Sequence, residues 1–320
     1  MAKHRCAILD DYQNVALKMA DWSKVSGDLD IKVFNEHLGN ADAVVKALQG
    51  FSIVSAMRER TAFPRAVIEK LPDLKLLITT GARNASIDVA AAAERGIVVC
   101  GTPSIGNPTS GIAIGLMLEL TRRIGYECAR MKAGVPWQST IGLDLEGLTL
   151  GVLGLGKLGT RTARIAQAFG MKVLAWSQNL TPEKCSEAGA EYASKDELFR
   201  RSDFITIHLV LSGRTRGLFG ANELRLMQPS AYIINTSRGP IIDEAALLAV
   251  LREKKIAGAG LDVFDVEPLP TDHPLRKLDN VVLTPHLGYV AIQNYRAYFA
   301  GVVDDIRAFL DGKPVRVMAA

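Results

Sequence analysis

The stretch LTLGVLGLGKLG, residues 148–159, joins a strand-like apolar run to three glycines at the spacing GxGxxG. The segment that follows has an apolar helical face, formed by Leu158, Ile165, Ala166 and Phe169. A second strand is predicted over residues 172–176. Glycines at this spacing permit a tight turn and close approach of a pyrophosphate, and the helix N-terminus offers free N–H groups. The pattern therefore predicts a βαβ dinucleotide site whose cofactor-binding turn comprises Gly154, Gly156, Lys157, Leu158 and Gly159.

The rest of the chain repeats this alternation of apolar strand-like runs and helix-like segments. The first series reads CAIL, IKVF, SIVSA, KLLITT and GIVVC, and the second reads LTLGVLG, KVLAW, FITIHL, AYIIN, AGAGLDVF and VVLT. Short continuous apolar strands separated by helices are typical of parallel sheets that are covered on both faces. A length of 320 residues allows roughly two domains at about 150 residues each. We expect an α/β protein with two parallel-sheet units.

Composition excludes several classes of protein. The formal net charge is +4 and the basic residues are scattered, which gives little electrostatic case for a nucleic-acid partner. The longest apolar run, residues 112–118, is too short to span a bilayer, and the N-terminus lacks a signal-peptide pattern. We expect a soluble, cytoplasmic protein with no membrane partner. No metal site or disulfide framework is indicated by the widely spaced cysteines, Cys6, Cys100, Cys128 and Cys185.

The end of the second strand of the βαβ unit bears on cofactor choice. A carboxylate that holds the adenosine ribose of NAD would fall about twenty residues after the first glycine, where the chain has Ser177, Gln178 and Asn179. These side chains do not repel a 2′-phosphate and can donate hydrogen bonds to it, although no arginine lies beside them. We therefore expect NADP or NAD as cofactor, with NADP favoured, and these three residues at the ribose.

Three later segments carry polar residues at the ends of predicted strands, where open α/β sheets bind ligands. Arg238 follows one strand, Glu267 follows the next, and His286 follows the last. An arginine, a glutamate and a histidine brought together at strand ends can bind a carboxylate and transfer a proton. Spacing alone leaves open the alternative that they are solvated loop residues.

Four motifs, VLGLGKLG, NTSRGPIIDEAAL, AGLDVFDVEPL and LTPHLG, together resemble the D-isomer-specific 2-hydroxyacid dehydrogenase family, of the glyoxylate/hydroxypyruvate reductase type. The resemblance covers nearly the whole chain. It implies two Rossmann-like domains, in which a dinucleotide-binding domain, residues 102–287, is inserted into a flavodoxin-like substrate domain, residues 1–101 and 288–320. It also implies a homodimer, with a long helix from about Asn107 reaching towards the partner.

The resemblance also implies roles for individual residues. Arg238 would bind the substrate carboxylate and polarise the 2-oxo group, His286 would be the general acid/base, and Glu267 would be its partner. A guanidinium offers a rigid fork that fits a carboxylate, and a histidine titrates near neutrality. Asp262 would hold the nicotinamide carboxamide, and His208 would lie at the edge of the cofactor.

The loop that contains Gly81, Ala82 and Arg83 resembles the family segment whose backbone N–H groups bind the substrate carboxylate. Many members have glycine where Arg83 stands, so its side chain either adds a second cation for an acidic substrate or is simply exposed. Arg58 matches a position of the substrate domain that faces the ligand in relatives, and a structural ion pair is its alternative role.

The function that the resemblance implies is NAD(P)-dependent oxidation of a D-2-hydroxy acid or reduction of a small anionic 2-oxo acid. Hydride would pass between the nicotinamide and C2 of the substrate, and a histidine would be the acid/base. Two alternatives stay open: a phosphoglycerate-dehydrogenase-like enzyme with a larger substrate, and a non-enzymatic NAD(H)-sensing protein like the corepressors that resemble this family.

Overall fold

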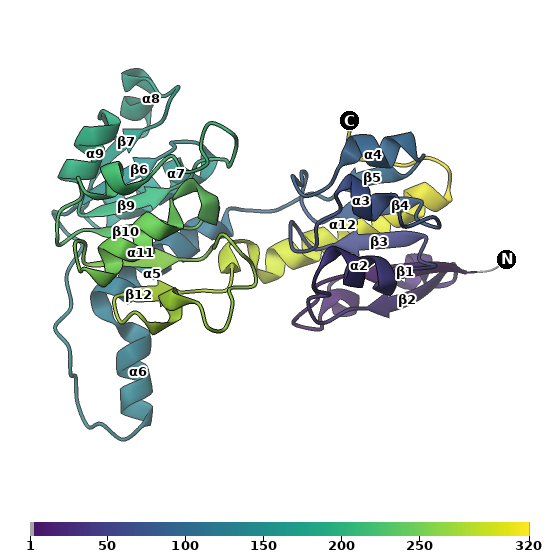
Figure 1. Ribbon diagram of the computed structural model, residues 1–320, viewed down its shortest axis with the longest axis horizontal. Coiled ribbons are helices and arrows are strands. Elements are labelled where there is room, and N and C mark those ends of the chain that lie inside the picture. The colour runs from purple at the N-terminus through teal and green to yellow at the C-terminus, as the bar shows by residue number, and fades with distance from the viewer. Residues whose placement is uncertain (1–2, 320) are drawn as a thin grey trace. The chain divides into compact units, whose positions relative to one another are not determined.

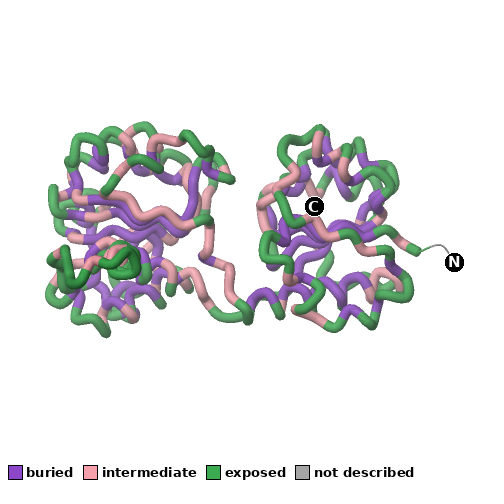
Figure 2. The backbone as a smooth tube through the Cα atoms, turned by 90° about the horizontal axis from the view of Figure 1, so that it is seen from below, coloured by how far each residue is buried: buried purple, intermediate pink, exposed green. Residues whose placement is uncertain are grey.

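The computed structural model describes residues 3–319, which form two compact units. Unit 1 is built from the chain up to Gly106 and from Ala291 onward, and unit 2 is Asn107–Val290. The resemblance implied divisions after residues 101 and 287. The structure divides the chain a few residues later, after Gly106 and Val290. The buried residues of each unit follow its strands, and the exposed residues lie outside them (Figure 2).

Unit 1 contains a five-stranded sheet in the order β2-β1-β3-β4-β5, in which all neighbouring strands are parallel. The strands are β1 (His4–Ile8), β2 (Leu29–Val33), β3 (Ile53–Ala56), β4 (Leu76–Thr79) and β5 (Val98–Gly101). The helices are η1 (Ala16–Lys18), α1 (Ser23–Ser26), α2 (Ala41–Ala47), α3 (Arg65–Ile68), α4 (Val89–Glu94) and α12 (Ile292–Leu310).

Alternate residues of these strands supply two cores. Ala7, Val54 and Leu77 pack with the apolar residues of α2, α3 and α4 on one face of the sheet (Figure 1). The strand residues between them point to the opposite face, because side chains alternate along a strand. There α12 packs against β4 and α1, and the ring of Trp22 lies 6.5 Å from that of Phe299. The continuous apolar runs of the sequence therefore reflect burial on both faces.

Unit 2 contains a seven-stranded sheet in the order β12-β11-β10-β9-β6-β7-β8, again with parallel neighbours throughout. The strands are β6 (Thr149–Leu153), β7 (Lys172–Trp176), β8 (Glu191–Tyr192), β9 (Phe204–Ile207), β10 (Tyr232–Asn235), β11 (Gly258–Leu261) and β12 (Val281–Leu283). The chain reverses its direction of winding between β6 and β9. Doubly wound sheets bind ligands at the carboxyl ends of the strands beside such a reversal.

Helices cover both faces of this sheet. They are α5 (Pro108–Arg122), α6 (Ile124–Lys132), α7 (Lys157–Ala168), α8 (Pro182–Glu187), α9 (Lys195–Arg201), α10 (Ala221–Leu224) and α11 (Glu244–Arg252), with 3-10 turns η2 (Gly239–Ile241), η3 (Pro274–Lys277) and η4 (Leu287–Tyr289). The helix α5 packs against α7 and the strands β10 to β12 on one face, and α9, α10 and α11 supply the core on the other. The predicted class, two Rossmann-like α/β units, is confirmed.

The long helix predicted from Asn107 is two helices in the structure. Arg123 adopts a left-handed conformation, with φ of 49°, and this ends α5 and begins α6. α6 extends away from the sheet of unit 2 (Figure 1) and has no buried residue. The segment from α6 to residue 143 exposes several apolar side chains, namely Ile124, Tyr126, Met131, Trp137, Ile141 and Leu143. We call residues 124–143 the arm.

Among residues 3–319, no helix is both long and apolar enough to cross a bilayer.

Candidate active site

The glycine turn between β6 and α7 is shaped by two close approaches of backbone. Gly154 has φ of +97°, and a Cβ at that position would lie 2.8 Å from the carbonyl oxygen of His208. A Cβ at Gly159 would lie 2.0 Å from the carbonyl oxygen of Gly154. A Cβ at Gly156 would meet no atom within 4 Å. Open space thus remains at the N-terminus of α7, where the first helical N–H groups lack partners within the helix. The turn fits a pyrophosphate.

The end of β7 has the polar character that the sequence predicted. Ser177 is half-buried, and Gln178 and Asn179 are exposed. The nearest carboxylate along the chain is Glu183, which sequence reasoning missed. Its carboxylate is hydrogen-bonded to the Thr181 side chain, which lowers the pKa of Glu183. A carboxylate therefore lies in α8, but it is already engaged by its own helix N-terminus.

His208 follows β9 at the same edge of the sheet. Its Nε2 lies 3.1 Å from Oγ1 of Thr206. Burial of the ring lowers the pKa of His208 to about 4, so the imidazole is neutral near pH 7. A neutral ring beside the glycine turn can accept or donate a hydrogen bond to a ligand, but it does not deliver a proton at neutral pH.

Arg238 follows β10 on a turn that is fixed from within. The buried side chain of Asn235 donates to the carbonyl oxygen of Arg238, at 2.9 Å, and accepts from the N–H of Ser237, at 3.0 Å. A Cβ at Gly239 would lie 2.1 Å from the carbonyl carbon of Phe264. Glycine therefore lets the turn of Arg238 pack directly against the loop that leads to Glu267. Sequence reasoning missed Asn235, although its place at a strand end is a signal for such a role.

Glu267 and His286 form a close pair. Oε2 of Glu267 lies 2.6 Å from Nδ1 of His286, and Oε1 accepts from the N–H of Phe264 at 3.0 Å. Both side chains are mostly buried, with 23% of Glu267 and 15% of His286 exposed. Since both carboxylate oxygens are engaged, the glutamate has one orientation. With Nδ1 on the carboxylate, proton exchange with a substrate would use Nε2.

The loop that carries His286 is held by Asp262, which is fully buried. Oδ1 of Asp262 accepts from Oγ1 of Thr284 and the N–H of Leu287, both at 2.6 Å, and Oδ2 accepts from the N–H of Gly288 at 2.7 Å. Burial raises the pKa of Asp262, and these hydrogen bonds oppose that shift. His286 itself has φ of 54°, a conformation that side chains seldom adopt. Asp262 thus stabilises the strained backbone that presents His286.

In unit 1 the loop after β4 is fixed by Arg58 and Asn84. The Arg58 guanidinium donates to the carbonyl oxygen of Thr80 at 3.2 Å, and a Cβ at Gly81 would lie 1.9 Å from its Nη1. The buried amide of Asn84 donates to the carbonyl oxygen of Arg58 at 2.6 Å.

The backbone donors of this loop are not equivalent. The N–H of Gly81 donates to Oγ1 of Thr102 at 2.8 Å. Within residues 3–319, no acceptor is seen for the N–H groups of Ala82 and Arg83. Three residues of this loop were predicted to bind the substrate carboxylate. The backbone N–H groups of Ala82 and Arg83 can donate to a ligand, whereas that of Gly81 already donates to Thr102.

Comparison with known proteins gives this chain a family. Residues 114–288 match the NAD-binding domain of D-isomer specific 2-hydroxyacid dehydrogenases. A glyoxylate reductase of Thermococcus litoralis is 38% identical over 258 residues, which cover 78% of each chain.

Solved structures agree. A phosphoglycerate oxidoreductase from Vibrio cholerae has a TM-score of 0.91 at 33% identity, and the match covers 98% of this chain and 100% of that one. An acyclic imino acid reductase in complex with NADPH and D-Arg has a TM-score of 0.76 at 27% identity, over 98% of this chain and 100% of that one.

Proposed function

Because the chain belongs to the D-isomer specific 2-hydroxyacid dehydrogenase family, we propose that it reduces a small 2-oxo acid, of the glyoxylate or hydroxypyruvate type, to the D-2-hydroxy acid. It is a nicotinamide-dependent oxidoreductase that acts on a CH–OH group. When bound, the nicotinamide supplies the hydride. The observation that carries the proposal is the 2.6 Å contact between Glu267 and His286, in the same unit as the glycine turn.

His286 is the general acid of the reduction. Its Nε2 donates a proton to the carbonyl oxygen as C2 receives hydride, and takes the proton back in the reverse direction. Glu267 stabilises the protonated ring, since an ionised carboxylate beside Nδ1 favours the imidazolium. Arg238 binds the carboxylate and polarises the 2-oxo group with a permanent charge. His208 is unsuited to the acid's role because burial lowers its pKa to about 4.

In unit 1, the N–H groups of Ala82 and Arg83 bind the substrate carboxylate. Arg58 lies over Gly81 and adds positive charge to the same loop. Backbone donors and a fixed guanidinium favour a small anion over a neutral ligand.

The cofactor is NADPH, with NADH as the weaker alternative. Ser177 and Gln178 offer hydrogen bonds without the repulsion that a carboxylate would exert on a 2′-phosphate. The nearest carboxylate along the chain, that of Glu183, is hydrogen-bonded to the Thr181 side chain. The relative solved with NADPH supports the assignment by analogy. Asp262 would hold the carboxamide as well as the His286 loop.

The protein is a homodimer that associates through the arm. Ile141 is 100% exposed and Trp137 is 73% exposed, and such apolar side chains on one projecting segment are typical of protein interfaces. Light scattering after gel filtration tests this, with Trp137→Ser and Ile141→Ser expected to yield monomer. A wild-type monomer would contradict the assignment.

The activity is tested by the loss of reduced-nicotinamide absorbance with NADPH and NADH in parallel. Glyoxylate, hydroxypyruvate, pyruvate and 3-phosphohydroxypyruvate form the panel. Rapid oxidation of NADPH with glyoxylate or hydroxypyruvate is expected. Exclusive turnover of the phosphorylated acid would replace the proposal with phosphoglycerate dehydrogenase, and tight cofactor binding without any turnover would favour an NAD(H) sensor.

A further inference from the structure

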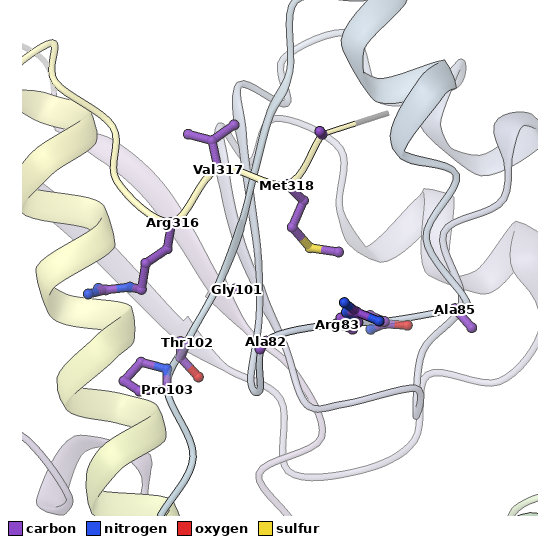
Figure 3. Close-up of a pocket in the computed structure, with 11 residues that line it drawn as sticks. Ala82, Arg83, Ala85, Gly101, Thr102, Pro103, Arg316, Val317 and Met318 are labelled. Atoms are coloured by element: carbon purple, nitrogen blue, oxygen red, sulfur yellow. The ribbon is translucent and has the colours of Figure 1, made fainter. Parts of the chain in front are cut away.

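Unit 1 contains an open pocket of about 660 Å³, beside the loop of Ala82 and Arg83 (Figure 3). Three segments form its walls: the loop after β4, the residues that follow β5, and residues 316–319. Its volume lies within the range of about 300–1,000 Å³ that small-molecule pockets occupy. Its place at the carboxyl ends of two neighbouring parallel strands is where sheets of this kind bind ligands.

The walls of this pocket are fixed by hydrogen bonds. The N–H of Thr102 donates to the carbonyl oxygens of Thr79, at 3.2 Å, and Gly81, at 3.1 Å. Residues 316–318 lie along β5, where the Gly101 N–H donates to Arg316 and the Met318 N–H donates to Val99, at 3.2 and 2.8 Å. The pocket is thus preformed, which lowers the cost of ordering it around a ligand.

Two cations and no carboxylate belong to the residues that line this pocket, and only one of the two cationic side chains lacks a partner among residues 3–319. Arg316 points towards α12 (Figure 3), where it contacts Oδ1 of the buried Asp305 at 2.8 Å and donates to the carbonyl oxygen of Gly301 at 3.0 Å. Arg83 is exposed, and it has no hydrogen-bond or ion-pair partner among residues 3–319.

Part of the wall is apolar, although Asn84 and Thr102 also line the pocket. Met318 points towards the loop of Ala82 and Arg83 (Figure 3), and Val317 is 53% exposed. An unpaired guanidinium beside a thioether fits a ligand with an aliphatic body and an acidic end.

We propose that this pocket receives the far end of a 2-oxo acid that carries a second carboxylate, and that the Arg83 side chain binds that carboxylate. The inference rests on the proposed function, because it requires the first carboxylate of the same substrate to lie at the N–H groups of Ala82 and Arg83. It makes Arg83 a residue that determines specificity, and it adds dicarboxylic 2-oxo acids, as the preferred members, to the small 2-oxo acids of the proposed function.

The test compares 2-oxoglutarate and oxaloacetate with glyoxylate for the wild type, Arg83→Ala and Arg252→Ala. Arg252, an exposed arginine at the end of α11 in unit 2, is the matched control. The wild type should have the higher kcat/KM with a dicarboxylic acid. Arg83→Ala should lower that value at least about tenfold more than the value for glyoxylate, mainly through KM, since a charge-assisted hydrogen bond is lost. Arg252→Ala should change neither value.

An equal loss for both kinds of acid in Arg83→Ala, or a wild type that prefers glyoxylate, would overturn the inference and leave the proposed function intact. Calorimetric titration with glutarate needs no turnover, so it separates the two proposals. The wild type should bind glutarate about tenfold more tightly than Arg83→Ala does. If no 2-oxo acid is turned over, the proposed function fails. Equal or undetectable glutarate binding by both proteins would overturn the inference on its own.

Met318 supplies a second variant that leaves Arg83 in place, because its side chain points towards the loop of Ala82 and Arg83 (Figure 3). Met318→Glu should weaken glutarate binding and Met318→Lys should strengthen it, each by about threefold to tenfold, because the new charge lies on the side of the segment that faces this loop. Identical binding by the two variants would contradict the inference.

Discussion

Replacing Glu267 by glutamine tests how the histidine is held in its protonated form. The N–H of Phe264 donates to Oε1 of Glu267, so the carbonyl oxygen of the new amide must stay there to accept it. The amide NH₂ then faces Nδ1 of His286, where the carboxylate oxygen lay at 2.6 Å. An NH₂ group only donates, so Nδ1 must accept, and a ring that is protonated on both nitrogens is disfavoured.

The size of the effect follows from the contact that is lost. A hydrogen bond between charged partners contributes about 1.5–3 kcal/mol, and the pair is mostly buried, so screening is weak. At 1.36 kcal/mol per factor of ten, kcat/KM for 2-oxo acid reduction should fall about 10- to 100-fold near neutral pH.

The assay is kcat/KM for 2-oxo acid reduction near neutral pH with saturating NADPH, with cofactor affinity measured by fluorescence. Glu244→Gln is the matched control, because Glu244 contacts His273 at 3.1 Å in the same unit but outside the proposed site. That variant should keep the wild-type kcat/KM. A folded Glu267→Gln enzyme that also keeps the wild-type kcat/KM would refute the reasoning.

Three further substitutions test separate parts of the structure. Asp262→Asn places an amide where three donors now meet a carboxylate. The free energy of unfolding should therefore fall by about 1–3 kcal/mol, and hydrogen exchange of the backbone amides of residues 284–288 should accelerate. Unchanged exchange would contradict the role of Asp262 in stabilising the His286 loop. Burial raises the pKa of Asp305 from 3.8 to about 7, so the folded state disfavours its ionised form and loses stability as pH rises through this window. The Asp305→Asn variant should therefore gain melting temperature relative to the wild type as pH rises from 4 to 7, and the difference between the two proteins should then level off. A difference that stays constant with pH would contradict this account. Ser177→Asp should raise KM for NADPH by about tenfold or more relative to KM for NADH, and an unchanged ratio would remove Ser177 from the ribose site.

The sequence predicted the elements that rest on local pattern. The glycine spacing marked the turn between β6 and α7, and runs such as KLLITT marked strands buried on both faces. The alternation of these elements was enough for the class, because parallel strands need crossover helices.

What the sequence left open depends on contacts between distant residues. Asn235 and Asp262 are polar residues at strand ends like many others, and only the folded backbone shows which donors they meet. The break at Arg123 was missed because the residue in the left-handed conformation is an arginine and not a glycine. The pocket beside Arg83 was not predicted because one of its walls, residues 316–319, is formed by the pairing of Val317 with Cys100 of β5. No local sequence pattern indicates this pairing.

The most direct test of the central claim is the turnover of His286→Ala, measured with NADPH and the preferred 2-oxo acid, together with its affinity for NADPH. The account predicts a loss in kcat of about 100-fold or more with unchanged cofactor affinity, because the proton donor is removed and the glycine turn is not. Near-normal turnover by a folded His286→Ala protein would contradict it.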